Sequence, residues 1–109
     1  MNYRLVIVEP AEADVDDIYA YILARSPQGA ASWYREFVAC TERMSRHPLA
    51  YAVAPEDAEF HLQLRQALFK TRHGDFYHCV FTIVEDEVRI LRVRGPGQAP
   101  LKASDIGTR

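Results

Sequence analysis

The sequence predicts an α+β fold: a small, mainly antiparallel sheet with an αα-hairpin on one face, in the order β-α-α-β-β-β. The first observation behind this prediction is the stretch 76–94, which contains two long apolar runs separated by an acidic pair typical of a turn. The second is a pair of amphipathic stretches, 11–23 and 27–47, separated by a short Pro- and Gly-containing break. Helices joined by so short a break favour an antiparallel hairpin that covers a sheet.

The length and composition favour one domain over 1–95, followed by a flexible tail over 96–109. The chain has 109 residues, and two domains would each be too small to bury a core. Hydrophobic residues make up 49% of the sequence, which excludes a disordered chain. The segment 95–100, Gly-Pro-Gly-Gln-Ala-Pro, cannot continue a strand, and the residues after it are mostly small and polar.

The N-terminal third predicts a strand followed by a helix. Residues 3–9 are mostly apolar and β-branched, and Pro10 ends the strand and suits the first turn of a helix. From Ala11 the apolar residues recur at helical spacing: Val15, Ile18, Tyr19, Ile22 and Leu23. Several carboxylates lie in the first turns, where the helix dipole favours negative charge, so they need no catalytic role.

The middle of the chain predicts a second helix, a connection and another strand. Ser26 or Pro27 begins the helix, and His47 ends it because the residue before a proline is pushed out of the helical region. Its expected buried seam is Ala30, Trp33, Phe37, Cys40 and Met44. Residues 49–59 are predicted to form a surface connection, 62–70 the second strand, and 72–75 a turn.

The final hairpin is predicted to lie at the centre of the sheet. Its first strand is largely apolar on both faces, so both faces are expected to be covered over its middle. Simple alternation in the second strand places Val88, Ile90, Arg92 and Arg94 on one face, with Leu91 and Val93 on the other. A strand that turns from apolar residues to arginines has reached a binding site or a solvated rim.

Charge and cysteine usage narrow the class of protein. The net charge of −2 argues against strong nonspecific affinity for nucleic acid. No apolar run is long enough to cross a membrane and no signal peptide is evident, so a cytoplasmic location is expected. Cys40 and Cys79 are far apart, without CxxC spacing or paired histidines. Buried, reduced thiols are therefore predicted, with no metal site and no cofactor.

The candidate site lies on the sheet face away from the helices, near the ends of the later strands. The candidate binding residues are Arg65, Lys70, Arg72, Arg92 and Arg94. Arg92 and Arg94 are two apart, so both project from one face, and Arg65 is expected to join them across the sheet. The alternative is that these arginines pair with the acidic turn or helix. His78 could be a general base or a hydrogen-bonded structural histidine.

The order of elements, with the segments 17–22, 64–68, 77–81 and 88–94, resembles the RelE/ParE superfamily of bacterial type II toxins. The resemblance covers 3–94. It implies a growth-inhibiting toxin of a plasmid-stabilisation type of system, neutralised by an antitoxin that wraps over it in a hetero-oligomer. RelE-type members are ribosome-dependent mRNA endoribonucleases, whereas ParE-type members inhibit DNA gyrase by binding.

The sequence departs from the nuclease branch of this superfamily. His78 stands where the nucleases usually present an arginine, and no tyrosine follows Tyr77, although they place one late in the chain. The resemblance therefore favours the ParE branch and a protein that is not an enzyme. The alternative is a RelE-like endoribonuclease with a reduced site, in which His78 and Arg92 would be catalytic. A third hypothesis is a member with lost toxicity or another target.

Overall fold

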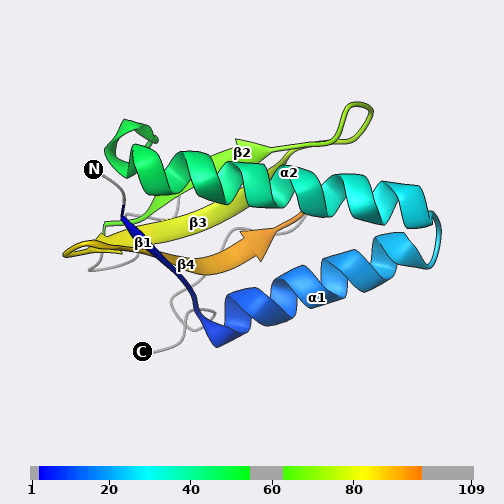
Figure 1. Cartoon of the computed structure of the whole chain (residues 1–109), viewed down its shortest axis with the longest axis horizontal. Helices are drawn as coiled ribbons and strands as arrows, with labels where there is room; N and C mark the ends of the chain where they lie inside the picture. Colours follow the sequence, from blue (N-terminus) through cyan, green and yellow to red (C-terminus); the bar gives the residue numbers. More distant parts are fainter. Residues whose placement is uncertain (1–2, 55–62, 97–109) are drawn as a thin grey trace.

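The computed structural model describes residues 3–54 and 63–96, and it confirms the predicted α+β fold and the order of its elements (Figure 1). The elements are β1 (Arg4–Ile7), α1 (Glu9–Leu23), α2 (Pro27–Arg46), a 3-10 turn (Pro48–Ala50), β2 (Arg65–Phe69), β3 (Tyr77–Val84) and β4 (Glu87–Arg94). The predicted tail lies outside the described residues from 97 onward, as does part of the predicted connection, 55–62. None of the described helices is long and apolar enough to span a membrane.

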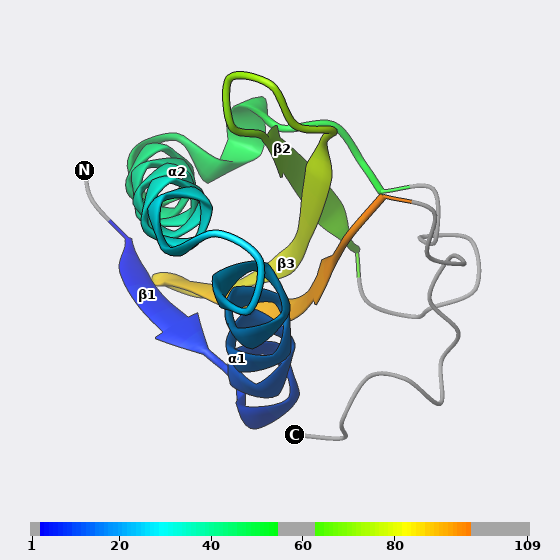
Figure 2. The same ribbon diagram turned by 90° about the vertical axis from the view of Figure 1, so that its right-hand side faces the viewer.

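The four strands form one sheet in the order β1-β4-β3-β2. β1 runs parallel to β4, and the other neighbours are antiparallel. Both helices lie on the same face, with α1 packed on β4 and α2 on β2 (Figure 2). None of the helices in the described ranges lies on the second face of the sheet.

Local sequence signals explain where α2 begins and ends. The Ser26 hydroxyl accepts a hydrogen bond of 2.9 Å from the Gly29 N–H, which caps the helix, and Pro27 occupies its first turn. Arg43 and Arg46 lie in the last turn, where positive charge is favourable. The helix ends before His47, the residue that precedes Pro48.

Two apolar clusters lie on opposite faces of the sheet. The larger one fills the space between the helices and the sheet and is centred on Trp33, whose ring lies 5.8 Å from Phe37 and 5.7 Å from Phe69 between centroids. The predicted seam of α2 is buried there. The smaller cluster, on the other face, is formed by Ala54, Leu64, Val80 and Leu91. Both faces of central β3 are therefore covered over its middle, as predicted.

The predicted faces of β4 are confirmed as far as Leu91 and are wrong from Arg92 onward. Phe81 pairs with Ile90 while Val80 pairs with Arg92, so Leu91 is an extra residue opposite the β3 step from 80 to 81. This β-bulge shifts the alternation of side chains by one position. Val93 consequently joins Val88 and Ile90 under the helices, whereas Leu91 lies in the cluster on the other face, as simple alternation predicted.

Candidate functional site

Three strands bring Leu68, His78 and Arg94 into one row on the sheet face away from the helices. His78 on β3 pairs with Leu68 on β2 and with Arg94 on β4. Residues directly opposite each other across a sheet project from the same face. The Leu68 side chain is 44% exposed, whereas His78 and Arg94 are half-buried. The row combines an apolar, a titratable and a cationic side chain near the surface.

The His78 ring is held by its neighbour on β2. Its Nδ1 lies 3.0 Å from Oε1 of Gln66. An amide oxygen only accepts hydrogen bonds, so Nδ1 carries the proton in this contact and Nε2 is the nitrogen that the bond does not use. The bond fixes the orientation of the ring on the sheet, as expected of a structural histidine.

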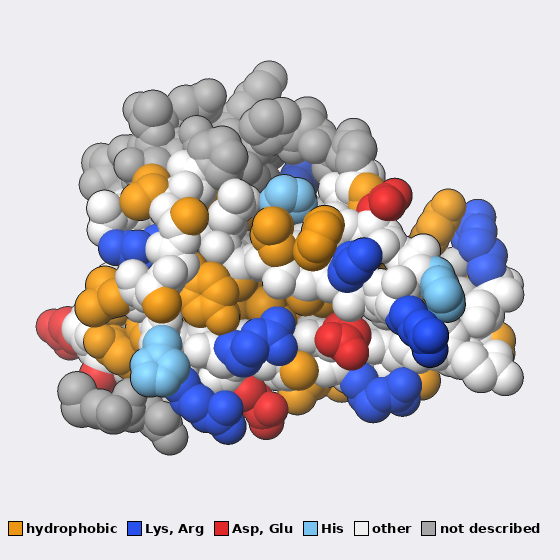
Figure 3. All heavy atoms as spheres, turned by 90° about the horizontal axis from the view of Figure 1, so that it is seen from above, with side chains coloured by type: hydrophobic (Ala, Val, Ile, Leu, Met, Phe, Trp, Pro, Cys, Tyr) orange, Lys and Arg blue, Asp and Glu red, His pale blue; other side chains and the backbone are white. Residues whose placement is uncertain are grey.

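The loop between β2 and β3 extends this row with exposed cations. Lys70 and Arg72 are exposed, and Lys70 Nζ lies 5.2 Å from the centroid of the Phe76 ring, itself 50% exposed. Cationic and histidine side chains lie interspersed with hydrophobic ones over the surface that carries β2 and α2 (Figure 3). We call the following set the hairpin face: Leu68, Lys70, Arg72, Phe76, His78 and Arg94.

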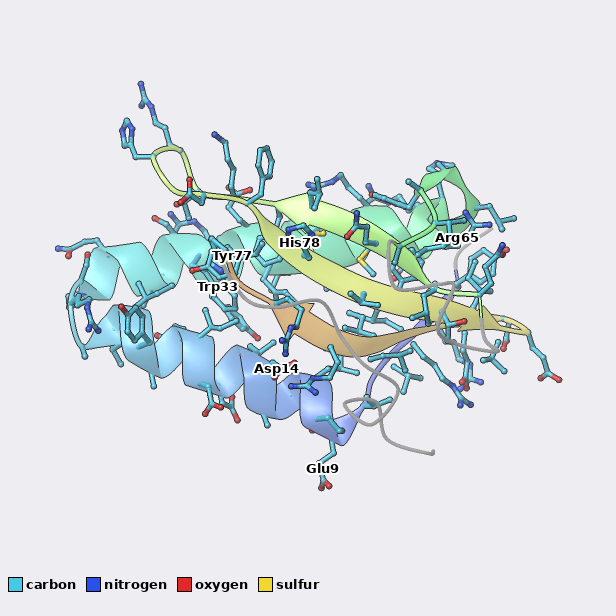
Figure 4. The ribbon with its side chains drawn as sticks, turned by 180° about the vertical axis from the view of Figure 1, so that it is seen from behind. Glu9, Asp14, Trp33, Arg65, Tyr77 and His78 are labelled. Carbon is cyan, nitrogen blue, oxygen red and sulfur yellow. The ribbon has the colours of Figure 1, made fainter. Side chains whose placement is uncertain are left out.

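Arg92 is engaged with a carboxylate of α1. Its Nε and Nη2 donate to the two oxygens of Asp14 at 2.7 and 2.8 Å, and the Val93 N–H donates to Asp14 Oδ2 at 2.9 Å. The Arg92 and Asp14 side chains are only 18% and 14% exposed. Because β1 ends at Ile7, β4 has no neighbouring strand here, and Asp14 supplies the missing acceptor (Figure 4).

Sequence reasoning missed Asp14, which it treated as one of several carboxylates favoured by the helix dipole. The sequence analysis came closest to it in its alternative hypothesis, in which the arginines of the last strand pair with the acidic turn or helix. Nothing in the sequence distinguishes Asp14 from Asp16 or Asp17, because only the packing of α1 on β4 selects one of them.

Arg65 lies away from the other candidate cations. It pairs with Phe81 and so projects from the helix side, toward the opposite end of the sheet from Tyr77 (Figure 4). Its Nη1 donates to the Tyr51 carbonyl at 2.6 Å and its Nη2 contacts Gln63 Oε1 at 3.3 Å. The structure therefore does not bring Arg65 together with Arg92 and Arg94.

Tyr77 precedes His78 on β3 but projects from the helix side of the sheet, with its ring 5.5 Å from Trp33 between centroids. Burial, and to a smaller extent the nearby Tyr21 and Asp75, raise the pKa of the Tyr77 phenol. At neutral pH this hydroxyl is protonated, so it can donate a hydrogen bond but is poorly suited to remove a proton.

The two cysteines are buried free thiols, as predicted. Burial raises the pKa of both, that of Cys79 most strongly. Across residues 3–54 and 63–96, no group of His, Cys, Asp and Glu side chains could hold a metal ion.

The hairpin face combines exposed charge with exposed apolar area, which suits the recognition of another macromolecule.

A family model described as the ParE toxin of the type II toxin–antitoxin system parDE matches residues 5–100. Among solved structures, the chain is similar to one titled as the chromosomal ParDE toxin–antitoxin system from P. aeruginosa. The TM-score is 0.66 with 20% identity, over 84% of this chain and 94% of that one. No curated protein matches the chain significantly.

Proposed function

The chain belongs to the family of ParE toxins of type II toxin–antitoxin systems, and from this premise we propose that it inhibits growth by binding DNA gyrase in the cytoplasm and is neutralised by a cognate antitoxin. The observation that carries inhibition by binding, rather than by RNA cleavage, is the engagement of Arg92 by Asp14.

Cleavage of RNA without a metal needs several cations around one phosphate and a group that moves a proton. Arg92 donates through Nε and Nη2 to the Asp14 carboxylate, and Arg65 donates to a backbone carbonyl at the other end of the sheet. The raised pKa of Tyr77 makes it a poor base. These contacts support a binding role, because few of the candidate groups are left to act on a phosphate.

The hairpin face supports contact with an antitoxin. Leu68 and Phe76 expose apolar area beside Lys70 and Arg72, which are also exposed. Such a surface suits a partner segment that carries apolar and acidic side chains. We infer that the toxin and antitoxin form a hetero-oligomer through this face.

The test of the target compares supercoiling of relaxed plasmid by gyrase with cleavage of mRNA on translating ribosomes, each with the purified protein. We expect supercoiling to be blocked and mRNA to stay intact. A His78→Ala variant, shown to be folded by circular dichroism, should keep its inhibition of gyrase. Ribosome-dependent cleavage that this variant loses would instead establish the endoribonuclease.

The test of the antitoxin is co-expression with a small reading frame beside the gene. We expect its untagged product to co-purify with the toxin and to restore growth. A harmless, soluble monomer obtained from the gene alone would contradict the proposal.

A further inference from the structure

The interface between α2 and the sheet contains three sulfur-bearing side chains. Cys40 and Met44 are one helical turn apart in the buried seam of α2, and Cys40 Sγ lies 3.8 Å from Met44 Sδ. Cys79 lies on β3 and belongs to the same apolar cluster on the helix side of the sheet. All three residues are fully buried. We call Cys40, Met44 and Cys79 the sulfur cluster.

The packing of α2 along β3 places Cys40 near Cys79. Trp33 lies against Tyr77, with 5.5 Å between ring centroids, and α2 and β3 run in the same direction from this contact (Figure 1). Cys40 is two helical turns after Trp33, about 10 Å farther along the helix. Cys79 is two residues after Tyr77, about 7 Å farther along the strand. Besides burial, the Cys40 thiol raises the pKa of Cys79, as expected of neighbouring thiols.

The separation of the two layers favours a bridging ion over a direct bond between the cysteines. A disulfide joins Cα atoms that are usually less than about 7 Å apart. Packed layers of secondary structure lie about 8–10 Å apart, so α2 would have to move toward β3 before Cys40 and Cys79 could bond. An ion held by both thiolates adds about 2.3 Å for each metal–sulfur bond, which fits the wider separation.

The kind and number of ligands select the ion. Thiolate and thioether sulfur atoms are soft ligands that favour cuprous copper. A structural zinc ion needs four ligands and an iron–sulfur cluster needs four cysteines. Within the described ranges, no His, Asp or Glu side chain completes a group of three with Cys40 and Cys79. Two thiols and the Met44 thioether therefore suit a cuprous ion best.

Arg43 offsets the charge that such a site carries. A cuprous ion bound by two thiolates keeps one negative charge, and burial of an unpaired charge is costly. Burial raises the pKa of Cys40, whereas the neighbouring Arg43 guanidinium acts in the opposite direction through its charge and a hydrogen bond. The same cation stabilises a thiolate that is bound to a metal ion.

We propose that the sulfur cluster binds one cuprous ion, which links α2 to β3. On binding, the thiols of Cys40 and Cys79 each release a proton and form a bond to copper, and no atom changes its oxidation state. The Met44 thioether adds a third, neutral ligand. Because the cluster is buried, the ion enters only when α2 separates locally from the sheet, so binding is slow. The inference does not depend on the cellular target.

The test uses the purified full chain, reduced and kept free of oxygen, with copper supplied as its cuprous bicinchoninate complex. After equilibration, we expect the protein to withdraw one copper ion per chain, measured by the loss of the coloured complex. X-ray absorption at the copper edge should show three sulfur neighbours. The midpoint of urea unfolding should rise, because the ion binds the folded state. These measurements use the unaltered protein, so a misfolded variant cannot hide a negative result.

Three variants test the ligands. Met44→Leu nearly conserves volume and removes the thioether, so copper affinity should fall about tenfold, with two sulfur neighbours left. Cys40→Ala and Cys79→Ala should each weaken binding by about 100-fold or more. The control is Val88→Ala, which removes a buried side chain from the same apolar cluster and leaves all three sulfur atoms in place. It should bind copper like the unaltered protein, and circular dichroism checks that each variant is folded.

Several results would overturn the proposal. One is that the folded protein takes no copper from bicinchoninate, and another is that Cys40→Ala or Cys79→Ala binds copper as tightly as the unaltered chain. Nitrogen or oxygen neighbours in the X-ray absorption spectrum would place the ion elsewhere. Equal affinity of Met44→Leu would contradict the three-sulfur site. A failure to inhibit gyrase would leave all of these readouts unaffected.

Discussion

Arg92 and Arg94 are two residues apart on β4, and their register partners Val80 and His78 lie on the same face of β3. Arg92 nevertheless turns to the strand edge, where Asp14 binds both its Nε and Nη2. Arg94 stays in the row with His78 and exposed Leu68. The difference shows that the role of a strand arginine is decided by the element that packs on the adjacent edge.

Two stretches along the β1 side of the sheet extend this comparison. Where β1 stops, α1 covers the edge of β4 and Asp14 accepts the Val93 N–H. Along β1 itself, no described strand pairs with the outer edge, to which Leu5 and Ile7 direct their backbone groups. An edge closed by a side chain contributes to folding, whereas an open edge keeps unpaired backbone groups.

The largest expected effect is the loss of stability caused by Asp14→Ala, which removes the side chain that closes the edge of β4. The substitution leaves the mostly buried Arg92 guanidinium without its carboxylate and the Val93 N–H without its acceptor. We expect the free energy of unfolding to fall by about 3 kcal/mol, measured by urea denaturation.

Two variants sharpen this test. Asp17→Ala, on an exposed position of the same helix, should change stability by less than about 0.5 kcal/mol. Asp14→Ala/Arg92→Met, which also removes the buried charge, should recover part of the loss. Equal effects of Asp14→Ala and Asp17→Ala on the free energy of unfolding would show that the contacts of Asp14 with β4 do not stabilise the fold.

A smaller effect is expected on the hairpin face, from Lys70→Glu/Arg72→Glu. Both residues are exposed, so the free energy of unfolding should stay within about 1 kcal/mol of that of the unaltered protein. If the proposed antitoxin contact holds, the affinity for the antitoxin should fall about 10- to 100-fold, measured by calorimetry, and less at high salt.

The control for this charge reversal is Arg35→Glu/Arg43→Glu, which makes the same change in net charge on exposed positions of α2. It should leave antitoxin affinity within about threefold, because screening weakens charges at a distance. A loss of affinity as large as that of the loop variant would mean that overall charge, and not the hairpin face, guides binding.

The fold was predictable because its signals are local. Ser26, Pro27 and the His47-Pro48 pair mark the ends of α2, and the seam through Trp33 and Phe37 has a plain helical period. The bulge at Leu91 was not predictable. It carries no glycine, and the groups bonded on either side of it, Val8 N–H to the Ile90 carbonyl and Asp14 to the Val93 N–H, are remote in sequence.

The candidate site was predictable only in part. The sequence places Arg72 in a turn and Arg94 near the end of the last strand, and both positions agree with the structure. It places Lys70 in the second strand, whereas β2 ends at Phe69, and it does not predict that His78 pairs with Arg94. It does not show that Arg65 binds the Tyr51 carbonyl, because that contact depends on how the chain after α2 returns to the sheet. Binding sites made of strand ends need the register, which short-range patterns do not supply.

The smallest expected effect is on the pH dependence of stability, and it tests the buried core without involving the hairpin face. Burial raises the pKa of Cys40 and Cys79 above 9.0 in the folded protein, so the folded state keeps these protons while the unfolded chain loses them. The unfolded state then binds fewer protons, and stability falls as pH rises. Between pH 8 and pH 9.5 we expect a loss of about 1 kcal/mol, measured by urea denaturation. In a Cys40→Ala/Cys79→Ala variant, which is less stable throughout, this slope should largely disappear; an unchanged slope would assign it to other groups.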